Sequence, residues 1–316
     1  MITWQALDGG ARTALVPFLS CTVQPDEAGR SVRDVVLRRW HLSRTLFRRV
    51  KALGGLWVDG QPVRGHRVVQ TGERIELALP PHPPAAAEPV AVPIVYEDPW
   101  LVVVDKPAGM VVHPSRGHPG GTLVNGLVHH RLQRGEPPWV HPVHRLDRGT
   151  SGLLLVAKNP YVHERLAPHR LAGRQRLGRS YVALALGHLA APSGVVSVPI
   201  DEPPPAPRQP AGPVPRRPDP SGRTAVTRYR VARRTWLEGQ PVSLVVLRLA
   251  SGRTHQIRVH LAFLGHPLVG DTLYGPPEAA LQRPWPALHA RKLWLVHPMG
   301  DRRLLFKAPV PFWPPV

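Results

Sequence analysis

The chain has 316 residues, enough for two domains or one large one, and its formal net charge of +20 favours a polyanionic partner. No long basic amphipathic helix stands out, so a nucleic acid fits this charge better than a membrane surface. The one cysteine, Cys21, excludes an internal disulfide framework and argues against a cysteine-based zinc site, and without a signal pattern or a membrane-length apolar run we expect a cytoplasmic protein.

The first clear elements are two short helices. Residues 1–27 show no firm pattern beyond possible strands that pack on the neighbouring helices. A capping pattern at Ser31 begins a helix with an apolar stripe over residues 32–40, and Ser43 begins a second helix that ends at Gly54. The inward positions of the second helix are expected to be Leu46, Phe47, Val50 and Leu53.

Short strands are predicted next, over residues 56–58, 68–69 and 74–77, with a turn at Asp59-Gly60. The outward positions of the two preceding helices carry basic side chains that could clamp an RNA backbone. A charged helix face is, however, more often merely solvated. The candidate RNA-binding residues are Arg38, Arg44, Arg48, Arg49 and Lys51, with Arg39 beside them.

The order of residues from Leu42 to Ile75 resembles the small RNA-binding module named after ribosomal protein S-four. The similarity covers residues 28–79 and departs from that family's pattern at Asp59, where asparagine is more frequent. It implies that the chain begins with a small α/β domain that binds RNA.

A Pro/Ala-rich linker over residues 80–92 separates this module from a second domain over residues 93–316. Prolines stiffen the linker, and nothing in it is expected to pair or pack. In the second domain, helices are predicted after Thr122, from Pro160 and over residues 257–264. Strands are predicted over residues 94–96, 101–104, 153–157, 180–186, 224–231 and 242–249.

Residues 202–220 contain the densest proline cluster of the chain. We interpret them as a surface excursion that behaves as a simple linker. Contact with substrate through Arg216 or Arg217 is the alternative.

A loop over residues 141–152 presents a single carboxylate, Asp147, between Arg145 and Arg148. The arginines favour the charged form of the acid, so it is available as a nucleophile or base at neutral pH. An apolar run directly after the loop predicts a buried strand. An ordinary surface ion pair in a turn is the alternative interpretation.

A second cluster of polar residues comes after the predicted strand at residues 242–249 and runs into a helix that contains Arg258. The neighbours of Arg258 on this helix are expected to be buried, and a guanidinium held by packing suits a bidentate pair with a carboxylate. A helix with a basic solvent face explains the spacing equally well.

Three motifs of the second domain resemble the signature motifs of the RluA-type pseudouridine synthases. They are the loop from His144 to Gly152, the strand around Tyr181, and the run from Gly252 to Arg258. Supporting matches place the similarity over residues 93–310. The chain departs from the family at Arg179, where lysine is usual before the motif tyrosine.

The resemblance implies an α+β fold with a mixed, largely antiparallel central sheet and peripheral helices. It also implies a reaction in which uridine within RNA becomes pseudouridine, through cleavage of the bond from ribose to ring nitrogen, rotation of the uracil and rejoining through carbon 5. Nothing is oxidised and nothing leaves, so neither a cofactor nor a metal is expected. Ribosomal RNA is the expected partner, with transfer RNA as the alternative, and we expect a monomer.

By similarity, Asp147 is the catalytic carboxylate, which acts either on the sugar or on the pyrimidine ring. Tyr181 stacks on the uracil and is a candidate base for the carbon 5 proton, provided that cations such as Arg258 lower its pKa from about 10. Arg258 is expected to pair with Asp147 and to hold it charged. The substrate-binding candidates are Arg145, which fills the gap left by the flipped nucleotide, Ile257 as an apolar wall, Arg253 and His144.

Other functions remain open from the residues alone. His141, His144 and Asp147 have a spacing that could suggest metal ligands, but Pro142 argues against a helix that carries all three. A metal-dependent nuclease would be sensitive to chelators. A catalytically silent RNA-binding or ribosome-assembly protein would need none of the three catalytic candidates.

Overall fold

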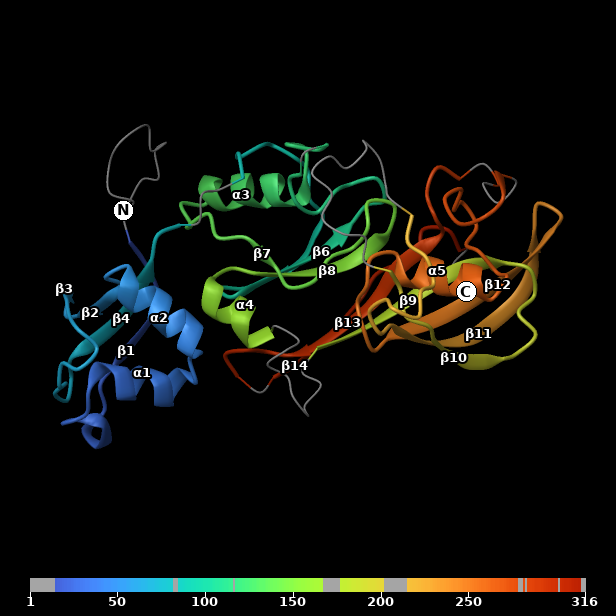
Figure 1. The fold of residues 1–316 in the computed structure, drawn as a ribbon. Helices are drawn as coiled ribbons and strands as arrows, with labels where there is room; N and C mark the ends of the chain where they lie inside the picture. Colours follow the sequence, from blue (N-terminus) through green and yellow to red (C-terminus); the bar gives the residue numbers. More distant parts are fainter. Residues whose placement is uncertain are drawn as a thin grey trace.

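The computed structural model of the protein describes residues 15–81, 85–115, 117–166, 177–201, 215–277, 281, 283–300 and 302–313. Its strands form two sheets, one at the N-terminal end and one that extends through the rest of the molecule (Figure 1). In the described residues no helix is both long and apolar enough to cross a membrane. Most of residues 202–220, the predicted excursion, lie outside the described ranges.

The N-terminal unit, residues 15–81, consists of two helices packed against a four-stranded sheet with the order β1-β4-β2-β3. Ser31 Oγ accepts a hydrogen bond from the backbone N–H of Asp34 and Ser43 Oγ accepts one from Leu46, so both predicted helix caps are confirmed. The bounds are β1 (Val16–Thr22), α1 (Val32–Trp40), α2 (Arg44–Ala52), β2 (Leu56–Val58), β3 (Gln61–Pro62) and β4 (Arg74–Leu79), with a 3-10 turn at Pro25–Glu27.

Strand β1 lies within residues 1–27, where possible strands were expected, and it pairs antiparallel with β4. Two details of this unit differ from the predictions. Residues 68–69 form no strand, because only Val68 makes a single bridge, to Ser31. Leu53, expected to face inward, is 45% exposed because α2 ends before it and the chain turns there.

Residues 85–92 of the predicted linker pack against α3 (Leu123–Gln133), a helix next to the large sheet. Asn125 Nδ2 donates to the carbonyl of Ala86 over 2.8 Å, and Glu88 Oε2 accepts the N–H of Gly121 over 2.7 Å. The expectation that nothing in residues 80–92 pairs is therefore wrong. The segment bonds to the side chain of Asn125 within α3 and to the turn that precedes this helix.

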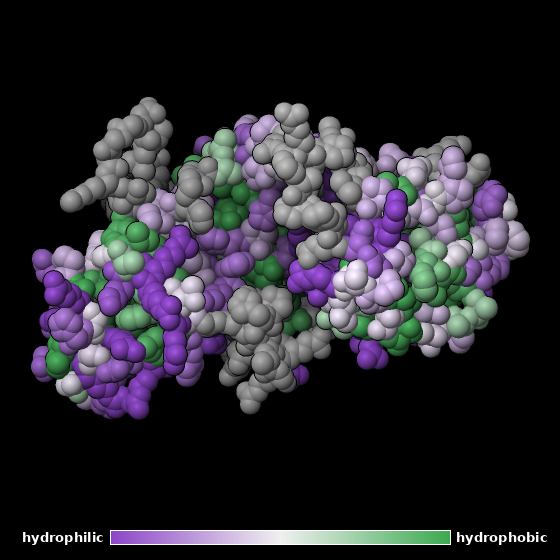
Figure 2. Space-filling view, in the orientation of Figure 1, coloured by the Kyte–Doolittle hydropathy of each residue, from purple (hydrophilic) through white to green (hydrophobic). Residues whose placement is uncertain are grey.

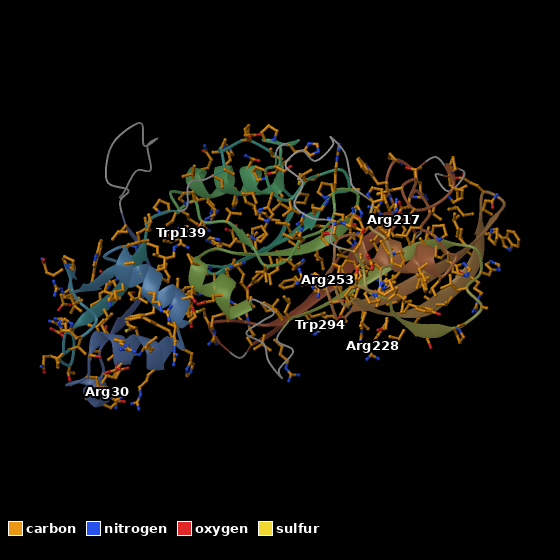
Figure 3. All side chains as sticks on the ribbon, viewed as in Figure 1. Arg30, Trp139, Arg217, Arg228, Arg253 and Trp294 are labelled. Carbon is orange, nitrogen blue, oxygen red and sulfur yellow. The ribbon has the colours of Figure 1, made fainter. Side chains whose placement is uncertain are left out.

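The N-terminal unit also packs directly on the rest of the molecule. Phe18 meets Trp139 edge to face with ring centroids 6.3 Å apart, and the hydroxyl of Tyr161 donates to the carbonyl of Trp40 over 3.0 Å. These four side chains belong to one buried apolar cluster that joins the two sheets. In Figure 3, Trp139 lies where the N-terminal unit meets the larger part. The two parts are therefore held together by side-chain packing as well as by the linker.

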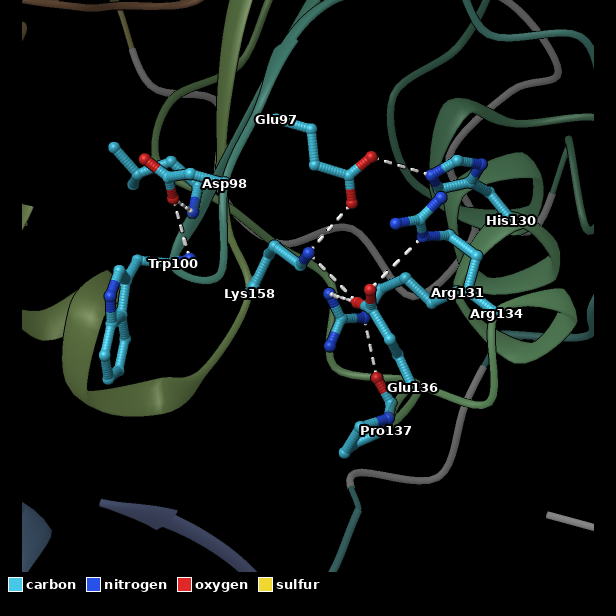
Figure 4. A network of polar contacts seen from close by, with 10 residues as sticks. Glu97, Asp98, Trp100, His130, Arg131, Arg134, Glu136, Pro137 and Lys158 are labelled. Atoms are coloured by element: carbon cyan, nitrogen blue, oxygen red, sulfur yellow. Dashed lines mark hydrogen bonds and ion pairs between the residues drawn. The ribbon is translucent and has the colours of Figure 1, made fainter. Parts of the chain in front are cut away.

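An ion-pair network lies next to this contact (Figure 4). Lys158 Nζ lies 2.8 Å from a Glu97 oxygen and 3.0 Å from a Glu136 oxygen, and Arg131 lies 2.8 Å from Glu136. His130 completes the network through the other Glu97 oxygen. Because each charge has a partner, the network can be half-buried beside Trp139 without an uncompensated charge.

Over the described residues the large sheet has ten strands, of which β7 and β14 lie off its main path, and its pairing is antiparallel except between β8 and β13. The fold is therefore α+β with a mostly antiparallel sheet, as predicted. The bounds are β5 (Ile94–Glu97), β6 (Leu101–Lys106), β7 (His141–Pro142), β8 (Ser151–Ala157), α4 (Pro160–Leu166), β9 (Leu177–Leu186), β10 (Ser193–Ser197), β11 (Val226–Leu237), β12 (Gln240–Leu249), α5 (Gln256–Phe263), β13 (Leu288–Val296) and β14 (Arg303–Lys307).

Both faces of the central strand β8 are covered, which explains its uninterrupted apolar run. Leu153 and Leu155 point into the cluster that includes α4, whereas Leu154 and Val156 point into the cluster that includes α3 and α5. A strand buried on both faces is what the sequence predicts directly after the Asp147 loop.

Strand β13, which was not predicted, lies between β8 and β9 in the middle of the sheet. It pairs with β8 through His289 opposite Ser151 and Ala290 opposite Gly152. Gly152 has a φ of +108°, and a Cβ there would lie 2.5 Å from the carbonyl oxygen of Ala290. Only glycine allows this approach, which brings the end of the Asp147 loop against β13.

Candidate active site

The loop that carries Asp147 is anchored by Lys106, a fully buried residue at the end of β6. Its ammonium donates to the carbonyls of Pro107, Met110 and Arg148 over 2.9, 2.9 and 3.2 Å. Burial lowers the pKa of Lys106 to about 8, although the charge of Asp147 opposes this shift. Lys106 thus joins the Asp147 loop to the turn after β6.

The sequence suggested a guanidinium on each side of the Asp147 carboxylate, but the Arg148 side chain bonds elsewhere. Its Nε donates to the carbonyl of Gly109 over 3.2 Å, and its guanidinium lies 5.1 Å from the ring centroid of Trp285. The side chain therefore fastens the loop to its surroundings. Arg145, by contrast, is exposed and lines a cavity above the loop.

This cavity, of about 650 Å³, opens above Asp147 and is within the size range of small-molecule sites. It lies where α5 and the strand ends meet, close to Arg253 in Figure 3. The structure brings six of the seven predicted catalytic and substrate-binding residues to its lining: His144, Arg145, Asp147, Tyr181, Arg253 and Ile257. The seventh, Arg258, is buried and does not line the cavity.

Tyr181 projects from β9 into this cavity and is only 4% exposed. Burial raises its pKa above the ordinary value, and the charge of Asp147 acts in the same direction. The cation that opposes this shift is Arg179, which lies two residues away on the same strand and lines the same cavity, and not Arg258 as predicted. The position where the chain departs from the family is therefore part of the site.

Arg258 pairs with Asp271 and not with Asp147. Its Nε and one terminal nitrogen lie 2.7 and 2.8 Å from the two Asp271 oxygens, a bidentate pair in a buried environment. Although burial opposes the charge of Arg258, the Asp271 carboxylate and then Asp147 raise its pKa. Asp147 thus raises the pKa of Arg258 through its charge, but the two side chains do not form the predicted ion pair.

The charge of Asp147 acts on groups from three separate parts of the chain, β6, β9 and the start of α5. It raises the pKa of Lys106, Tyr181, His255 and Arg258 against or beside the effect of their burial. Titratable groups with shifted pKa values that gather around one cavity are typical of functional sites.

His144 has a structural bond within the site. Its Nε2 accepts the backbone N–H of Leu155 over 3.3 Å, and burial lowers its pKa well below the ordinary value, so the ring is neutral. The ring of His141 instead packs 5.6 Å from that of His163. Over the described ranges no three His, Cys, Asp or Glu side chains gather as metal ligands do.

Several residues of the site were not assigned roles from the sequence. Leu288 adds an apolar wall, and Arg179 lines the cavity beside Tyr181. Asp271 and Lys106 stood only among the supporting family matches, in Gly-Asp and Lys-Pro-Ala-Gly runs. Their roles depend on contacts across the fold, which spacing along the chain does not reveal.

A basic groove lies on the N-terminal unit, over which hydrophilic side chains gather in Figure 2. Its volume is about 1180 Å³, and its lining includes Arg44, Arg48 and Lys51. Arg38 and Arg49 are exposed outside the groove. Arg39 differs from the rest because it pairs with Glu27 over 3.0 Å and donates to the carbonyl of Thr22.

Comparison with known proteins finds one family and many relatives. The pattern of the RNA pseudouridylate synthase family matches residues 100–263. The RNA pseudouridine synthase YjbO of Bacillus subtilis is 36% identical, and the match covers 85% of this chain and 92% of that protein. Ribosomal large subunit pseudouridine synthase D of Pseudomonas aeruginosa is 36% identical, with 82% and 81% covered. The solved structure of human RNA pseudouridylate synthase domain containing 1 is 28% identical with a TM-score of 0.57, and covers 72% of this chain and 87% of that one.

Proposed function

We propose that this chain, which belongs to the RNA pseudouridylate synthase family of isomerases, converts uridine to pseudouridine in ribosomal RNA with Asp147 as its catalytic carboxylate and without a cofactor. The observation that carries the assignment of the site is the meeting of Asp147 and Tyr181 in one cavity of nucleotide size. Ribosomal RNA is favoured because relatives are named for the large ribosomal subunit, and transfer RNA is the alternative.

The reaction needs a carboxylate, a surface for the base and a pocket that retains free uracil. Asp147 attacks or assists at the bond between ribose and uracil, on the sugar or on the ring. Tyr181 stacks on the uracil, while Ile257 and Leu288 form apolar walls. Because burial raises the pKa of Tyr181, it serves better as a stacking phenol than as the base for the carbon 5 proton.

Arginines at the cavity contact the RNA. Arg145 is exposed at the lining, where its flat guanidinium can replace the base of a flipped nucleotide. Arg253 Nε donates to the carbonyl of Thr224 over 3.1 Å, which leaves its other nitrogens for a phosphate. The basic groove of the N-terminal unit binds the RNA backbone at a distance from the reaction, as an S-four-like module would.

Replacement of Asp147 tests this function. Asp147→Asn keeps the size of the side chain and removes its charge, so turnover should fall more than about a thousandfold, while RNA affinity changes less than about threefold because phosphate contacts supply most of the binding. Tritium release or pseudouridine mapping on ribosomal RNA measures turnover, and filter binding measures affinity. The control is Asp26→Asn, at an exposed position of the N-terminal unit.

Two outcomes would contradict the proposal. Retained turnover in the Asp147→Asn variant refutes the role of this carboxylate. RNA binding by the wild-type protein without pseudouridine formation in ribosomal or transfer RNA indicates a silent RNA-binding protein instead.

A further inference from the structure

His255 occupies an unusual backbone position at the edge of the cavity. It is the residue before α5 and has a φ of +58° in the left-handed region, which residues other than glycine seldom adopt. It is 9% exposed and lines the same cavity as Asp147. Such conformations persist where surrounding contacts hold them, and they cluster at functional sites.

The contact that holds His255 is with Tyr274. The Tyr274 oxygen lies 2.8 Å from His255 Nδ1, and the two rings meet nearly edge to face. The same oxygen accepts the backbone N–H of Arg216 over 2.8 Å. On the face of the Tyr274 ring lies the guanidinium of Arg258, 4.9 Å from the centroid, which can accept nothing.

These contacts determine where the protons lie. Since Tyr274 receives the Arg216 N–H, its own hydroxyl hydrogen needs an acceptor, and His255 Nδ1 is the acceptor that the described residues offer. A neutral imidazole that accepts at Nδ1 carries its hydrogen on Nε2. That second nitrogen has no hydrogen-bond partner among the described residues, and the ring lines the cavity.

We infer that His255 is a further substrate-binding residue, whose Nε2–H donates to an oxygen of the reacting uridine beside Asp147, and that Tyr274 is a positioning residue that sets this tautomer. The inference rests on the proposed function. It gives a role to His255, the middle residue of the run from Gly252 to Arg258.

The surroundings keep this donor neutral. Burial, followed by the charges of Arg258 and Arg216, lowers the pKa of His255, while Asp147 and Asp271 act against this shift. A neutral donor can orient the substrate without neutralising the Asp147 carboxylate by an ion pair. Tyr274, whose own pKa is raised by burial, remains a phenol throughout the working range.

The test compares substitutions that keep or remove the Nε2 hydrogen. His255→Leu removes the donor, so kcat should fall about 10- to 100-fold, as when a buried polar group loses its hydrogen-bond partner. His255→Gln places an amide donor near the same point and should recover part of this loss. Tyr274→Phe keeps the His255 ring but no longer fixes which of its nitrogens carries the hydrogen. At alkaline pH kcat should therefore fall several-fold, with little change in RNA affinity.

The pH dependence separates a tautomer effect from simple damage to packing. When imidazole gains a proton, both ring nitrogens carry hydrogen, and Nε2 is a donor whatever Tyr274 does. The defect of Tyr274→Phe should therefore shrink as the pH falls through the pKa of His255, whereas the defect of His255→Leu should not. In the double variant the loss should equal that of His255→Leu alone.

Matched controls are Tyr229→Phe and His188→Leu, since Tyr229 packs under Gly194 on the sheet and His188 is exposed beside Trp236. Both should retain wild-type rates. The inference is overturned if Tyr274→Phe has wild-type kcat at every pH, or if its loss is independent of pH and adds to that of His255→Leu. Absence of pseudouridine with the wild-type chain would instead overturn the proposed function.

Discussion

At the scale of single residues, the buried pair of Arg258 and Asp271 shows how the site is supported. The Asp271 side chain is fully buried and that of Arg258 is 10% exposed, so each charge depends on the other. The pair also lies under Tyr274, which connects it to His255 and the cavity. Arg258 therefore influences Asp147 through position and charge, and not through a direct bond.

Loss of the Asp271 charge should affect stability and turnover together. Asp271→Asn leaves the buried Arg258 charge without its counterion, which is expected to destabilise the fold by about 3–5 kcal/mol. Chemical denaturation measures the stability, and kcat measures the site. Asp219→Asn is the control and should change neither, because within the described ranges the Asp219 side chain accepts hydrogen bonds from Ser221 alone. Wild-type stability together with lost activity would show that Arg258 pairs with Asp147 in solution.

At the scale of elements, the N-terminal helices and strands differ in the side chains that they expose to a partner. The strands bury their apolar residues in the sheet, whereas α2 exposes Arg44, Arg48 and Lys51 into one groove. Phosphate contacts by such side chains release counterions, so their contribution appears as salt dependence. Arg39 on α1 has the same charge but is bound to Glu27.

Neutralising the groove should therefore change the response to salt. The triple variant Arg44→Gln, Arg48→Gln and Lys51→Gln should weaken RNA binding and reduce the slope of log affinity against log salt by roughly 2 to 3 units, about 0.7 to 0.9 per lost contact. The rate at saturating RNA should remain. Arg39→Gln, which removes one positive charge outside the groove, is the control and should keep the wild-type slope. An equal slope in the triple variant and the wild type would exclude α2 from the RNA interface.

At the scale of the whole molecule, the N-terminal unit is packed on the large sheet as well as linked to it. Phe18 and Trp40 cover Trp139 and Tyr161, and residues 85–88 bond to the start of α3. Under the proposed function, the unit presents RNA to the cavity from a defined position. Its removal would also expose apolar side chains that are buried in the full chain.

Deletion of residues 1–79 should accordingly have two effects. RNA binding should weaken and become less dependent on salt, as the charge alone predicts, while the chemistry persists on RNA at high concentration. The thermal midpoint of the remaining chain should also fall, because Trp139 and Tyr161 lose their cover. Calorimetry and binding at several salt concentrations measure the two effects. A truncated chain with an unchanged midpoint would contradict the packing of Phe18 and Trp40 on the large sheet.

Much of the local structure could be predicted from the sequence, because helix caps, turns and apolar periodicity depend on residues a few positions apart. Ser31, Ser43 and Thr122 each cap the helix that was predicted from them, and the apolar run after Asp147 is a strand buried on both faces. The residues that line the cavity were also identified, through motifs that the chain shares with a family.

The sequence by itself determined which carboxylate stands in a reactive loop, which helices begin where, and that the chain is strongly basic. Only the tertiary structure decided that Arg258 binds Asp271 and that β13 enters the middle of the sheet beside Gly152. The physical reason is that an ion pair or a strand pairing depends on distance in space, and residues far apart along the chain compete for the same partner until packing selects one.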